Sequence, residues 1–248
     1  MNPKISLIIA TKNASKTIGS CVDSIVSQSY PTYEIVVQDA VSIDGIEKIL
    51  GSYDREKVRV FVEDDTGIYD AWNRALRRTT GDWVMFLGAD DRLAHERVLE
   101  NRVDLLRRTT GPVELVSGRI AFVDKAATIS RVIGAAWDWP AMLKYQSVVH
   151  IGLMHHRSLF DRFGLFDSRY RIAGDYDFLL RFGRETRALF INEIEILAGG
   201  SGISQTEVSR ALWETYQIQA QHKEIGPLRG ALNFTLAWMK YGYRWLRK

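Results

Sequence analysis

The first 93 residues alternate short apolar runs with segments of helical periodicity, and this alternation restricts the possible folds more than any other feature. The apolar runs predict strands at residues 4–10, 34–38, 58–62 and 83–87. The segments between them predict helices that begin at Ser15 and that cover residues 43–53 and 68–78. Strands joined by crossover helices form a mostly parallel sheet with helices on both faces, so we expect an α/β fold.

The length and composition agree with such a fold. A chain of 248 residues with 46% hydrophobic residues can bury the core of one generous α/β domain. The formal net charge is only +3 and acidic and basic residues are interleaved, so we expect no nucleic-acid partner. The single cysteine, Cys21, excludes an internal disulfide and a thiolate zinc site, and we expect it in the core.

The N-terminal residues MNPKISLIIATKN do not have the pattern of a signal peptide. Their apolar run is short, and neither a charged start nor a small-residue cleavage site is present. No segment reaches the roughly 18 consecutive apolar residues of a transmembrane helix. The sequence therefore predicts a cytoplasmic protein.

Polar residues follow each of the four predicted strands. Ligands of parallel α/β sheets bind beyond the carboxyl ends of the strands, where these residues are expected to gather. Most of them are acidic, so one edge of the sheet becomes a carboxylate-rich rim. The residues are Thr11 and Asn13, then Asp39, then Glu63, Asp64 and Asp65, and finally Asp90 and Asp91.

The motifs that are absent narrow the choice of ligand. No Gly-x-Gly-x-x-Gly follows the first strand and no Gly-x4-Gly-Lys-[Ser/Thr] occurs, so neither a dinucleotide nor a phosphate-loop site is expected. Carboxylates suit Mg²⁺ or Mn²⁺, which take one or two protein ligands and complete their shell with water and a substrate diphosphate. Such a cation would also offset the repulsion between the adjacent Asp90 and Asp91.

The order of these motifs resembles the family 2 glycosyltransferases of the GT-A fold. The resemblance spans roughly residues 4–200 and is carried by ISLIIATKN, EIVVQD followed by SIDG, EDDTGIYDAWNRAL, TGDWVMFLGADD and FGLFDSRYRIAGDYDFLLRF. It implies a Rossmann-like sheet that binds a nucleotide-diphospho-sugar, with a UDP-sugar favoured. It also implies a divalent cation, Mn²⁺ or Mg²⁺, and transfer of a hexosyl or N-acetylhexosaminyl group with inversion at the anomeric carbon.

The resemblance assigns the donor site to residues at the strand ends. Asp39 matches the aspartate that accepts a hydrogen bond from the nucleotide base, and Thr11 and Asn13 match the loop around that base. Asp65 matches the aspartate of a Pro-Asp-Lys-Gly pattern, although this chain has Asp64 before it. The alternative for each residue is ordinary turn and loop chemistry.

The resemblance assigns the cation and the sugar to the adjacent acids. Asp91 is expected to bind the metal directly, and Asp90 is expected nearer the ribose. The family often has a further acid where this chain has Gly88. The alternative is that the pair caps the turn before a helix that includes His95, Val98 and Leu99.

Asp175 matches the catalytic base of the family. An inverting transfer needs one base to accept the proton of the acceptor hydroxyl. The base of the family often follows a glutamate, whereas Gly174 precedes it here. Asp177 and Arg181 are expected to support the site from the same helix. The alternative is that Asp175 is only the N-cap of that helix.

Weaker expectations concern two further segments. His150 matches a histidine of a Pro-His-Gln motif and can contact diphosphate, metal or acceptor, with core packing as its alternative. His155 and His156 are expected to be structural. Residues 199–202, with the sequence GGSG, resemble a flexible loop over the donor, with a plain turn as the alternative.

The domain organisation follows from the same resemblance. Residues 1–203 are expected to form the GT-A domain, with a nucleotide-binding half at about 1–92 and an acceptor-binding, catalytic half at about 93–203. Residues 204–248 are a C-terminal helical extension, with one helix over 204–225 and another from Pro227. The second helix is aromatic-rich and ends with Arg244, Arg247 and Lys248. It can lie on an anionic membrane surface as a peripheral attachment at the inner face of the plasma membrane, or it can dock on the domain.

The sequence therefore predicts a metal-dependent inverting glycosyltransferase that acts on a glycan or lipid-linked acceptor, in surface polysaccharide biosynthesis. One alternative is a catalytically silent GT-A-like subunit that binds nucleotide sugars or acts as a scaffold. Retention of Asp39, Asp91 and Asp175 argues against it. The other is a sugar-phosphate nucleotidyltransferase, which needs a Gly-rich basic loop that ATKNASKTIG does not supply.

Overall fold

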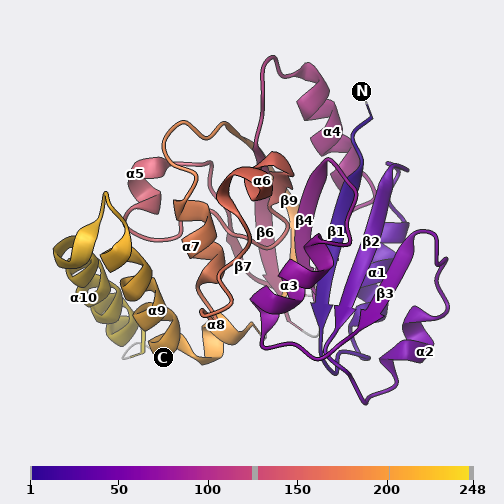
Figure 1. Cartoon of the computed structure of the whole chain (residues 1–248), viewed down its shortest axis with the longest axis horizontal. Helices are drawn as coiled ribbons and strands as arrows, with labels where there is room; N and C mark the ends of the chain where they lie inside the picture. The colour runs from indigo at the N-terminus through magenta and orange to yellow at the C-terminus, as the bar shows by residue number, and fades with distance from the viewer. Residues whose placement is uncertain (1, 125–127, 201, 246–248) are drawn as a thin grey trace.

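A computed structural model describes residues 2–124, 128–200 and 202–245, and its centre is a nine-stranded sheet (Figure 1). The order across the sheet is β3-β2-β1-β4-β8-β6-β9-β5, and β7 pairs with β6. The strands are β1 (Ile5–Thr11), β2 (Tyr33–Asp39), β3 (Val58–Val62), β4 (Trp83–Gly88), β5 (Arg92–Leu93), β6 (Leu115–Val123), β7 (Ile129–Ile133), β8 (Met154–His156) and β9 (Ala188–Gly199). Ser201, Arg247 and Lys248, which the sequence analysis named, lie outside the described residues.

The four predicted strands form a parallel block in which β1 lies between β2 and β4. Beyond β4 the sheet is mixed, because β8 is antiparallel to β4 and to β6, whereas β9 is parallel to β6. Antiparallel pairs need no crossover helix, so the strand-helix alternation ends where this second half begins. The α/β prediction with helices on both faces is confirmed.

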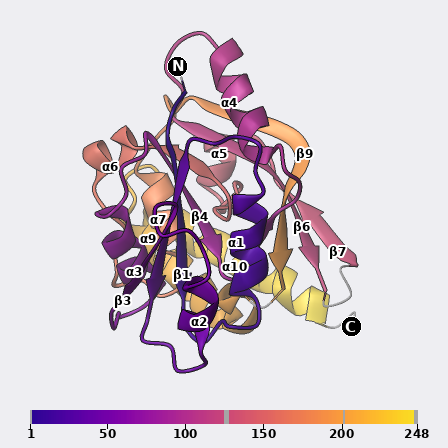
Figure 2. The same cartoon turned by 90° about the vertical axis from the view of Figure 1, so that its right-hand side faces the viewer.

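Helices cover both faces of the sheet (Figure 2). Each face has its own apolar layer of side chains. Leu7 and Ile9 face the layer that contains Cys21, whereas Ile8 faces the opposite layer. The first layer is covered by α1 (Ile18–Val26), α2 (Ile46–Leu50) and α4 (Val98–Arg108). The second is covered by α3 (Ile68–Leu76), α5 (Trp139–Met142), α6 (Ser158–Phe163), α7 (Gly174–Leu180) and α9 (Val208–Gln221).

Some predicted helix boundaries were wrong, for local reasons. The first helix begins at Ile18 rather than Ser15, and α2 is shorter than residues 43–53 because Gly45 before it has a left-handed φ of 82°. His95 precedes α4 instead of lying in it. The predicted helix over 204–225 is divided at Glu207 into α8 (Ile203–Thr206) and α9.

The C-terminal helices α9 and α10 (Gly226–Trp245) pack side by side, at the end of the molecule away from β3 (Figure 1). Trp213 and Tyr216 of α9 contact the ring of Phe234 of α10. Asn233 Nδ2 donates to Leu143 O at 3.2 Å, so α10 also docks on the rest of the chain. Within the described ranges, no helix combines the length and apolar character that crossing a membrane requires.

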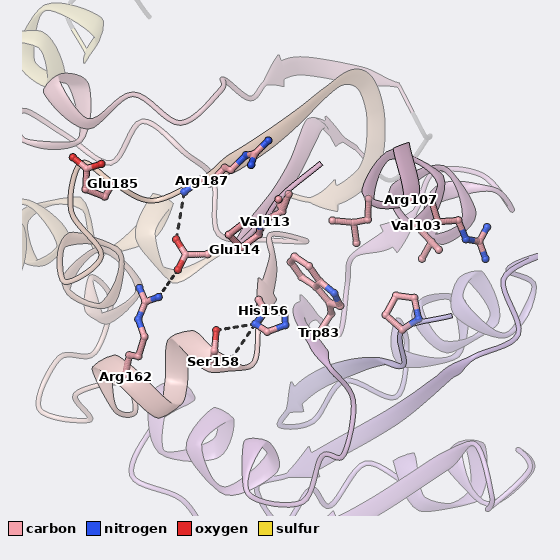
Figure 3. Close-up of a pocket in the computed structure, with 14 residues that line it drawn as sticks. Trp83, Val103, Arg107, Val113, Glu114, His156, Ser158, Arg162, Glu185 and Arg187 are labelled. Atoms are coloured by element: carbon pink, nitrogen blue, oxygen red, sulfur yellow. Dashed lines mark hydrogen bonds and ion pairs between the residues drawn. The ribbon is translucent and has the colours of Figure 1, made fainter. Parts of the chain in front are cut away.

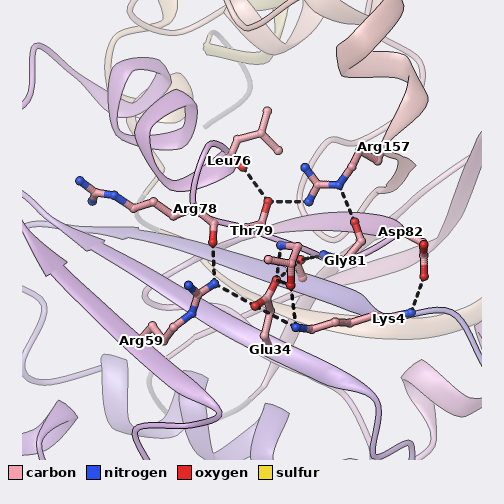
Figure 4. Close-up of polar contacts among 11 residues, drawn as sticks. Lys4, Glu34, Arg59, Leu76, Arg78, Thr79, Gly81, Asp82 and Arg157 are labelled. Carbon is pink, nitrogen blue, oxygen red and sulfur yellow. Dashed lines mark hydrogen bonds and ion pairs between the residues drawn. The ribbon is translucent and has the colours of Figure 1, made fainter.

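A buried carboxylate at the amino ends of the strands is surrounded by donors and cations (Figure 4). Glu34 accepts from Ser6 Oγ at 2.7 Å and from Thr80 N–H at 2.5 Å, and it pairs with Lys4 at 3.1 Å and Arg59 at 2.8 Å. Burial alone would raise its pKa, but the hydrogen bonds from Thr80, Ser6 and Lys4 outweigh burial and lower the pKa to about 2. Glu34 is therefore ionised at neutral pH and ties the amino end of β2 to those of its neighbours.

Candidate active site

The carboxyl ends of β1 and β2 are joined by hydrogen bonds centred on Ser42. Its Oγ donates to Asp39 Oδ1 at 2.5 Å and accepts from Asn13 N–H at 2.7 Å, and its N–H donates to Asp39 Oδ2 at 2.8 Å. Asn13 Oδ1 accepts from Ile43 N–H at 3.0 Å. Val41 in the same loop has a φ of 52°, a left-handed conformation that costs a β-branched residue about 1–3 kcal/mol. The two loops form one polar surface at the predicted base-binding edge.

Asp39 is in contact with its own turn, as the alternative interpretation expects, but it keeps further capacity to accept hydrogen bonds. Each carboxylate oxygen has a second lone pair beside the one that Ser42 uses. Thr11, which pairs with Asp39 in the sheet, has a buried hydroxyl without a hydrogen-bond partner among the residues described. An orphaned buried hydroxyl costs about 1–3 kcal/mol, which a ligand at this edge would recover.

Asp65 lies in the loop between β3 and α3. Its Oδ1 accepts from Gly67 N–H at 3.0 Å, and burial, together with nearby Asp70, raises its pKa. The carboxyl is therefore at the predicted edge, but turn chemistry accounts for its observed contact.

Asp90 and Asp91 converge around Gly88 at the end of β4. A Cβ added to Gly88 would lie 2.8 Å from Asp91 Oδ2 and 3.0 Å from Asp90 Oδ1. An acid at position 88 would thus collide with the two carboxylates that follow it. The positions of the Asp90 and Asp91 carboxylates therefore explain why this chain has glycine at position 88, where the family often has an acid.

The two acids differ in their surroundings. Asp91 is 2% exposed, and its Oδ2 accepts from Gly88 N–H at 2.7 Å. Burial and the neighbouring charge of Asp90 raise its pKa to about 7. Asp90 lines a cavity of about 510 Å³ whose other charged lining residues are Lys16, Arg92 and Asp124. Asp90 therefore borders the cavity, whereas the Asp91 carboxylate is buried in the turn after Gly88.

Asp175 is held between two side chains from distant parts of the sequence. Tyr69 Oη lies 3.1 Å from Asp175 Oδ1, and Gln146 Nε2 donates to Asp175 Oδ2 at 2.8 Å. Burial raises the pKa of Asp175, while the bonds from Gln146 and Tyr69 oppose that shift. The carboxyl is within the first turn of α7, so the simple N-cap alternative is wrong: the cap residue is Ala173. A carboxyl of raised pKa with two fixed partners is suited to general acid-base chemistry.

Gly174 is explained by the ring of Tyr69. A Cβ at position 174 would lie 2.8 Å from a ring carbon of Tyr69. A glutamate at this position could not coexist with Tyr69 in its present place. The position of the Tyr69 ring therefore explains both why glycine replaces glutamate at position 174 and how Tyr69 contacts Asp175.

The predicted supporting residues Asp177 and Arg181 form an ion pair on α7. Arg181 also donates to Phe163 O at 3.0 Å and to Leu165 O at 2.7 Å. These contacts anchor the helix that carries Asp175, so the structure gives this pair a supporting position.

His150 lies in an aromatic cluster. It is 3% exposed, stacks on Trp72 at 5.0 Å, and neither ring nitrogen has a hydrogen-bond partner in the described part of the chain. Burial lowers its pKa to about 3. Its surroundings match the packing alternative, and its ligand contact stays a prediction. His155 is also fully buried, and His156 contacts Trp83 at 5.1 Å, which agrees with structural roles.

Another cavity, of about 750 Å³, opens at the opposite edge of the sheet (Figure 3). Trp83, the first residue of β4, lines it. Two of its arginines are paired with acids, Arg162 with Glu114 at 2.5 Å and Arg107 with Asp104 at 2.7 Å. None of the predicted site residues lines this cavity.

The residues at the carboxyl edge fit a hard divalent cation in their chemistry. Asp90 and Asp91 supply two adjacent carboxylates, and burial together with the charge of Asp90 raises the pKa of Asp91. In the described segments, no group of three or more His, Cys, Asp or Glu side chains could hold a metal alone. The pair therefore suits a cation that takes its remaining ligands from water and substrate.

Sequence reasoning missed three residues of this site: Ser42, Tyr69 and Gln146. Tyr69 lies in the first turn of the predicted helix over 68–78, where it could be taken for core packing. Gln146 lies outside the motifs that carry the family resemblance. Glu214 was also missed; its carboxylate accepts from the N–H groups of Ile172 at 2.8 Å and Ala173 at 3.0 Å, just before Asp175. Glycine at 174 was the available signal, because it marks space taken by another side chain.

Comparisons with known proteins agree with this geometry. The family model for glycosyl transferase family 2 matches residues 6–146, more than half of the chain. A PGL/p-HBAD biosynthesis glycosyltransferase of Mycobacterium bovis is 34% identical over 182 residues, which cover 72% of this chain and 69% of that protein. TuaG of Bacillus subtilis, whose name places it in teichuronic acid biosynthesis, is 34% identical over 107 residues, 42% of each protein. The chain belongs to glycosyl transferase family 2 and is a glycosyltransferase.

Solved structures support the same fold. S. aureus TarS 1-349 in complex with UDP-GlcNAc has a TM-score of 0.70 at 16% identity, covering 93% of this chain and 70% of TarS 1-349. The mannosyltransferase PcManGT from Pyrobaculum calidifontis, in complex with GDP-Man and Mn²⁺, has a TM-score of 0.67 at 21% identity, covering 95% and 69%. The prediction of a GT-A fold is confirmed.

Proposed function

We propose that this enzyme transfers a sugar from a nucleotide-diphospho-sugar, with a UDP-sugar favoured, to a hydroxyl group of a glycan or lipid-linked acceptor. The observation that carries the proposal is the carboxyl of Asp175, which has a raised pKa and is fixed by Tyr69 and Gln146. Tyr69 is at the start of α3, which follows the carboxyl end of β3, so the base belongs to the donor-binding edge.

In the proposed reaction, Asp175 accepts the proton of the acceptor hydroxyl while that oxygen attacks the anomeric carbon. Attack from the face opposite the diphosphate inverts the anomeric configuration and needs no covalent sugar-enzyme intermediate. Asp90 and Asp91 would hold Mn²⁺ or Mg²⁺, with Asp91 as the predicted direct ligand and Asp90 on the cavity side. A bound cation supplies charge neutralisation for the leaving diphosphate.

The donor end of the site is proposed to be formed by Thr11, Asn13, Asp39 and Asp65. The Thr11 hydroxyl, which has no hydrogen-bond partner in the part of the chain that the structure describes, and the spare lone pairs of Asp39 support recognition of a base by hydrogen bonds. The ligands named for TarS and PcManGT, UDP-GlcNAc and GDP-Man with Mn²⁺, support a nucleotide-sugar donor and a divalent cation. The name of TuaG, a putative teichuronic acid biosynthesis glycosyltransferase, supports a place in surface polysaccharide biosynthesis.

We propose the same division of the chain as the sequence predicts: a donor half at about 1–92, a catalytic half at about 93–203, and the extension 204–248. Glu214 of the extension binds the backbone that leads to Asp175, so the extension supports the base as well as packing on the domain.

The extension also offers a surface for a membrane. Large apolar side chains of α10 are exposed at intervals of three or four residues, and therefore lie on one side of the helix: Leu228, Leu232, Leu236, Met239 and Tyr243. The helix contains Arg229, Lys240 and Arg244 and no acidic residue. An apolar stripe with basic neighbours suits the surface of an anionic membrane, where a lipid-linked acceptor would be available.

Flotation with vesicles tests this attachment. The double variant Leu232→Glu/Leu236→Glu should lose at least about tenfold in binding to vesicles that contain phosphatidylglycerol, because two charges would enter the apolar boundary. Ile43→Glu is the matched control, since Ile43 is 90% exposed but distant in sequence from the stripe. Equal flotation of the double variant and the control would contradict the membrane proposal. The proposal would also be contradicted if the stripe joined two copies of the chain and did not bind vesicles.

Release of nucleoside diphosphate tests the reaction itself. The enzyme is incubated with a panel of UDP- and GDP-sugars, with Mn²⁺, Mg²⁺ or EDTA. We expect release from at least one donor, dependent on the cation and accelerated by the correct acceptor. Release that persists unchanged in EDTA would contradict metal dependence, and a retained anomeric configuration in the product would contradict inversion.

A further inference from the structure

The hydroxyl of Tyr69 lies between two oxygen atoms but has only one proton to donate. It is 2.6 Å from Ile172 O and 3.1 Å from Asp175 Oδ1. A backbone carbonyl is always an acceptor, whereas a carboxyl oxygen accepts when ionised and donates when it carries the proton. The direction of the bond between Tyr69 and Asp175 therefore depends on the protonation state of Asp175.

Each protonation state of Asp175 has its own hydrogen-bond arrangement here, and Ile172 O receives the proton of Tyr69 in only one of them. When Asp175 is ionised, Tyr69 donates to Oδ1. When Asp175 is protonated at Oδ1, it donates to Tyr69 Oη, and Tyr69 donates to Ile172 O. Gln146 Nε2 remains a donor to Oδ2 at 2.8 Å in both states. A phenol between a carbonyl and a carboxyl is thus complementary to a group that gains and loses a proton.

Packing fixes the Tyr69 ring where this exchange needs it. Tyr69 is 3% exposed, and its ring contacts Trp72 at 5.4 Å and Phe166 at 5.7 Å. Its other neighbour is Gly174, where a Cβ would come within 2.8 Å of the ring. The absence of a side chain at 174 is therefore a condition for the bond between Tyr69 and Asp175.

We propose that Tyr69 is the positioning residue of the base, and that its single proton turns from Asp175 Oδ1 to Ile172 O when Asp175 takes the proton of the acceptor hydroxyl. This inference rests on the proposed function. The acceptor O–H bond breaks and its electron pair forms the new bond to the anomeric carbon. The bond from that carbon to the diphosphate breaks with its pair, and the proton forms an O–H bond on Asp175, which later releases it to water.

Other charged groups around this site are already paired. On α3, Asp70 pairs with Arg74 at 3.1 Å. On α7, Asp177 pairs with Arg181, and on α9 the carboxylate of Glu214 is held by backbone N–H groups and by Arg210 at 3.1 Å. Titration of Asp175 should therefore report chiefly on Tyr69 and Gln146.

The test is a titration of the aspartate carboxyl groups by ¹³C NMR in the full-length protein, with Asp175→Asn to identify the Asp175 signal. Tyr69→Phe removes a hydrogen bond to the anion, so we expect the Asp175 midpoint to rise by about one pH unit. The acidic limb of the transfer rate should move by the same amount. Gly174→Ala, which displaces the ring, should give a shift of the same sign if the phenylalanine variant folds poorly.

Tyr176→Phe is the matched control, because Tyr176 is a buried neighbour on α7 whose hydroxyl donates to Met142 O at 2.6 Å. Its Asp175 midpoint should equal that of the wild type. A midpoint that stays within about 0.2 pH units in Tyr69→Phe and Gly174→Ala would overturn the inference. A shifted midpoint in an enzyme whose Asp175→Asn variant still transfers sugar would instead leave the bond to Tyr69 in place and remove Asp175 as the base.

Discussion

Carboxylates at the amino and the carboxyl edge of this sheet have pKa values that are shifted in opposite directions. Glu34, at the amino edge, has Lys4, Arg59 and two further donors, and its pKa is lowered to about 2. At the carboxyl edge, Asp91 is buried and Asp175 is partly buried. Within the described residues neither pairs with a basic side chain, and burial raises the pKa of both. We propose that this difference separates structural from functional carboxylates, because only a carboxylate without a basic partner leaves room for a cation or a proton from a substrate.

The largest expected effect is on catalysis. Asp175→Asn should lower transfer by at least about 10³-fold, because the amide cannot accept the hydroxyl proton. Nucleotide affinity should remain close to that of the wild type. Single-turnover rates measured beside calorimetric binding would check both; a variant that transfers sugar at the normal rate would place Asp175 with Glu34 among the structural carboxylates.

At the amino edge the expected effect is on stability. Glu34→Gln should cost about 2 kcal/mol in the free energy of unfolding at pH 7, since it removes the anion that several donors and cations share. The pKa of Glu34 is lowered, so this stabilisation is present above about pH 4.5 and is lost as the pH falls toward 2. Urea unfolding of both proteins from pH 7 to 3 measures the difference. A difference that does not shrink in acid would show that charge is not its source.

Asp91→Asn should have an effect of opposite sign in metal-free buffer. The pKa of Asp91 is raised to about 7, so the folded wild type loses stability as the pH rises from about 4 to 7, when this carboxyl must ionise. The amide does not ionise, and each unit of pKa shift corresponds to about 1.4 kcal/mol. The variant should therefore be more stable by up to about 4 kcal/mol at pH 8 and equal to the wild type below pH 4. Thermal unfolding in EDTA across this range provides the measurement; a variant less stable at pH 8 would contradict the contrast between the edges.

His150→Phe should have the smallest effect. The ring is buried on Trp72 without a hydrogen-bond partner in the described structure, and a similar volume of aromatic carbon should cost less than about 1 kcal/mol. Transfer rates should stay within about twofold of the wild type. A loss of activity larger than tenfold would restore the predicted role of His150 at the ligand.

The four parallel strands of the first 92 residues could be predicted because their sequence pattern is local. An apolar run of five to seven residues followed by a helical segment specifies a βαβ unit, and four such runs place Thr11, Asp39 and Asp91 at one edge. The strand pairing of the second half could not be predicted in this way, because β6 and β9 pair across a large separation in sequence and with shifts in register.

The contacts of the candidate site could likewise be predicted only where the residues are close in sequence. Ser42 is three residues from Asp39, but Tyr69 and Gln146 reach Asp175 from 106 and 29 residues away. The ion pair of Arg102 with Glu195, buried at 2.8 Å, likewise joins α4 to β9 through residues that no local pattern connects. Contacts of this kind are decided by packing in three dimensions.

The central claim is that the acidic pair at the carboxyl edge binds a cation together with a nucleoside diphosphate. The most direct measurement is the melting temperature of the wild type, Asp91→Asn and Asp175→Asn with UDP or GDP, with and without Mn²⁺. We predict that one nucleotide raises the melting temperature by about 5 °C at saturation only when Mn²⁺ is present, that Asp175→Asn keeps this increment, and that Asp91→Asn loses it. The claim is contradicted if neither nucleotide stabilises the wild type in Mn²⁺, or if Asp91→Asn retains the full increment.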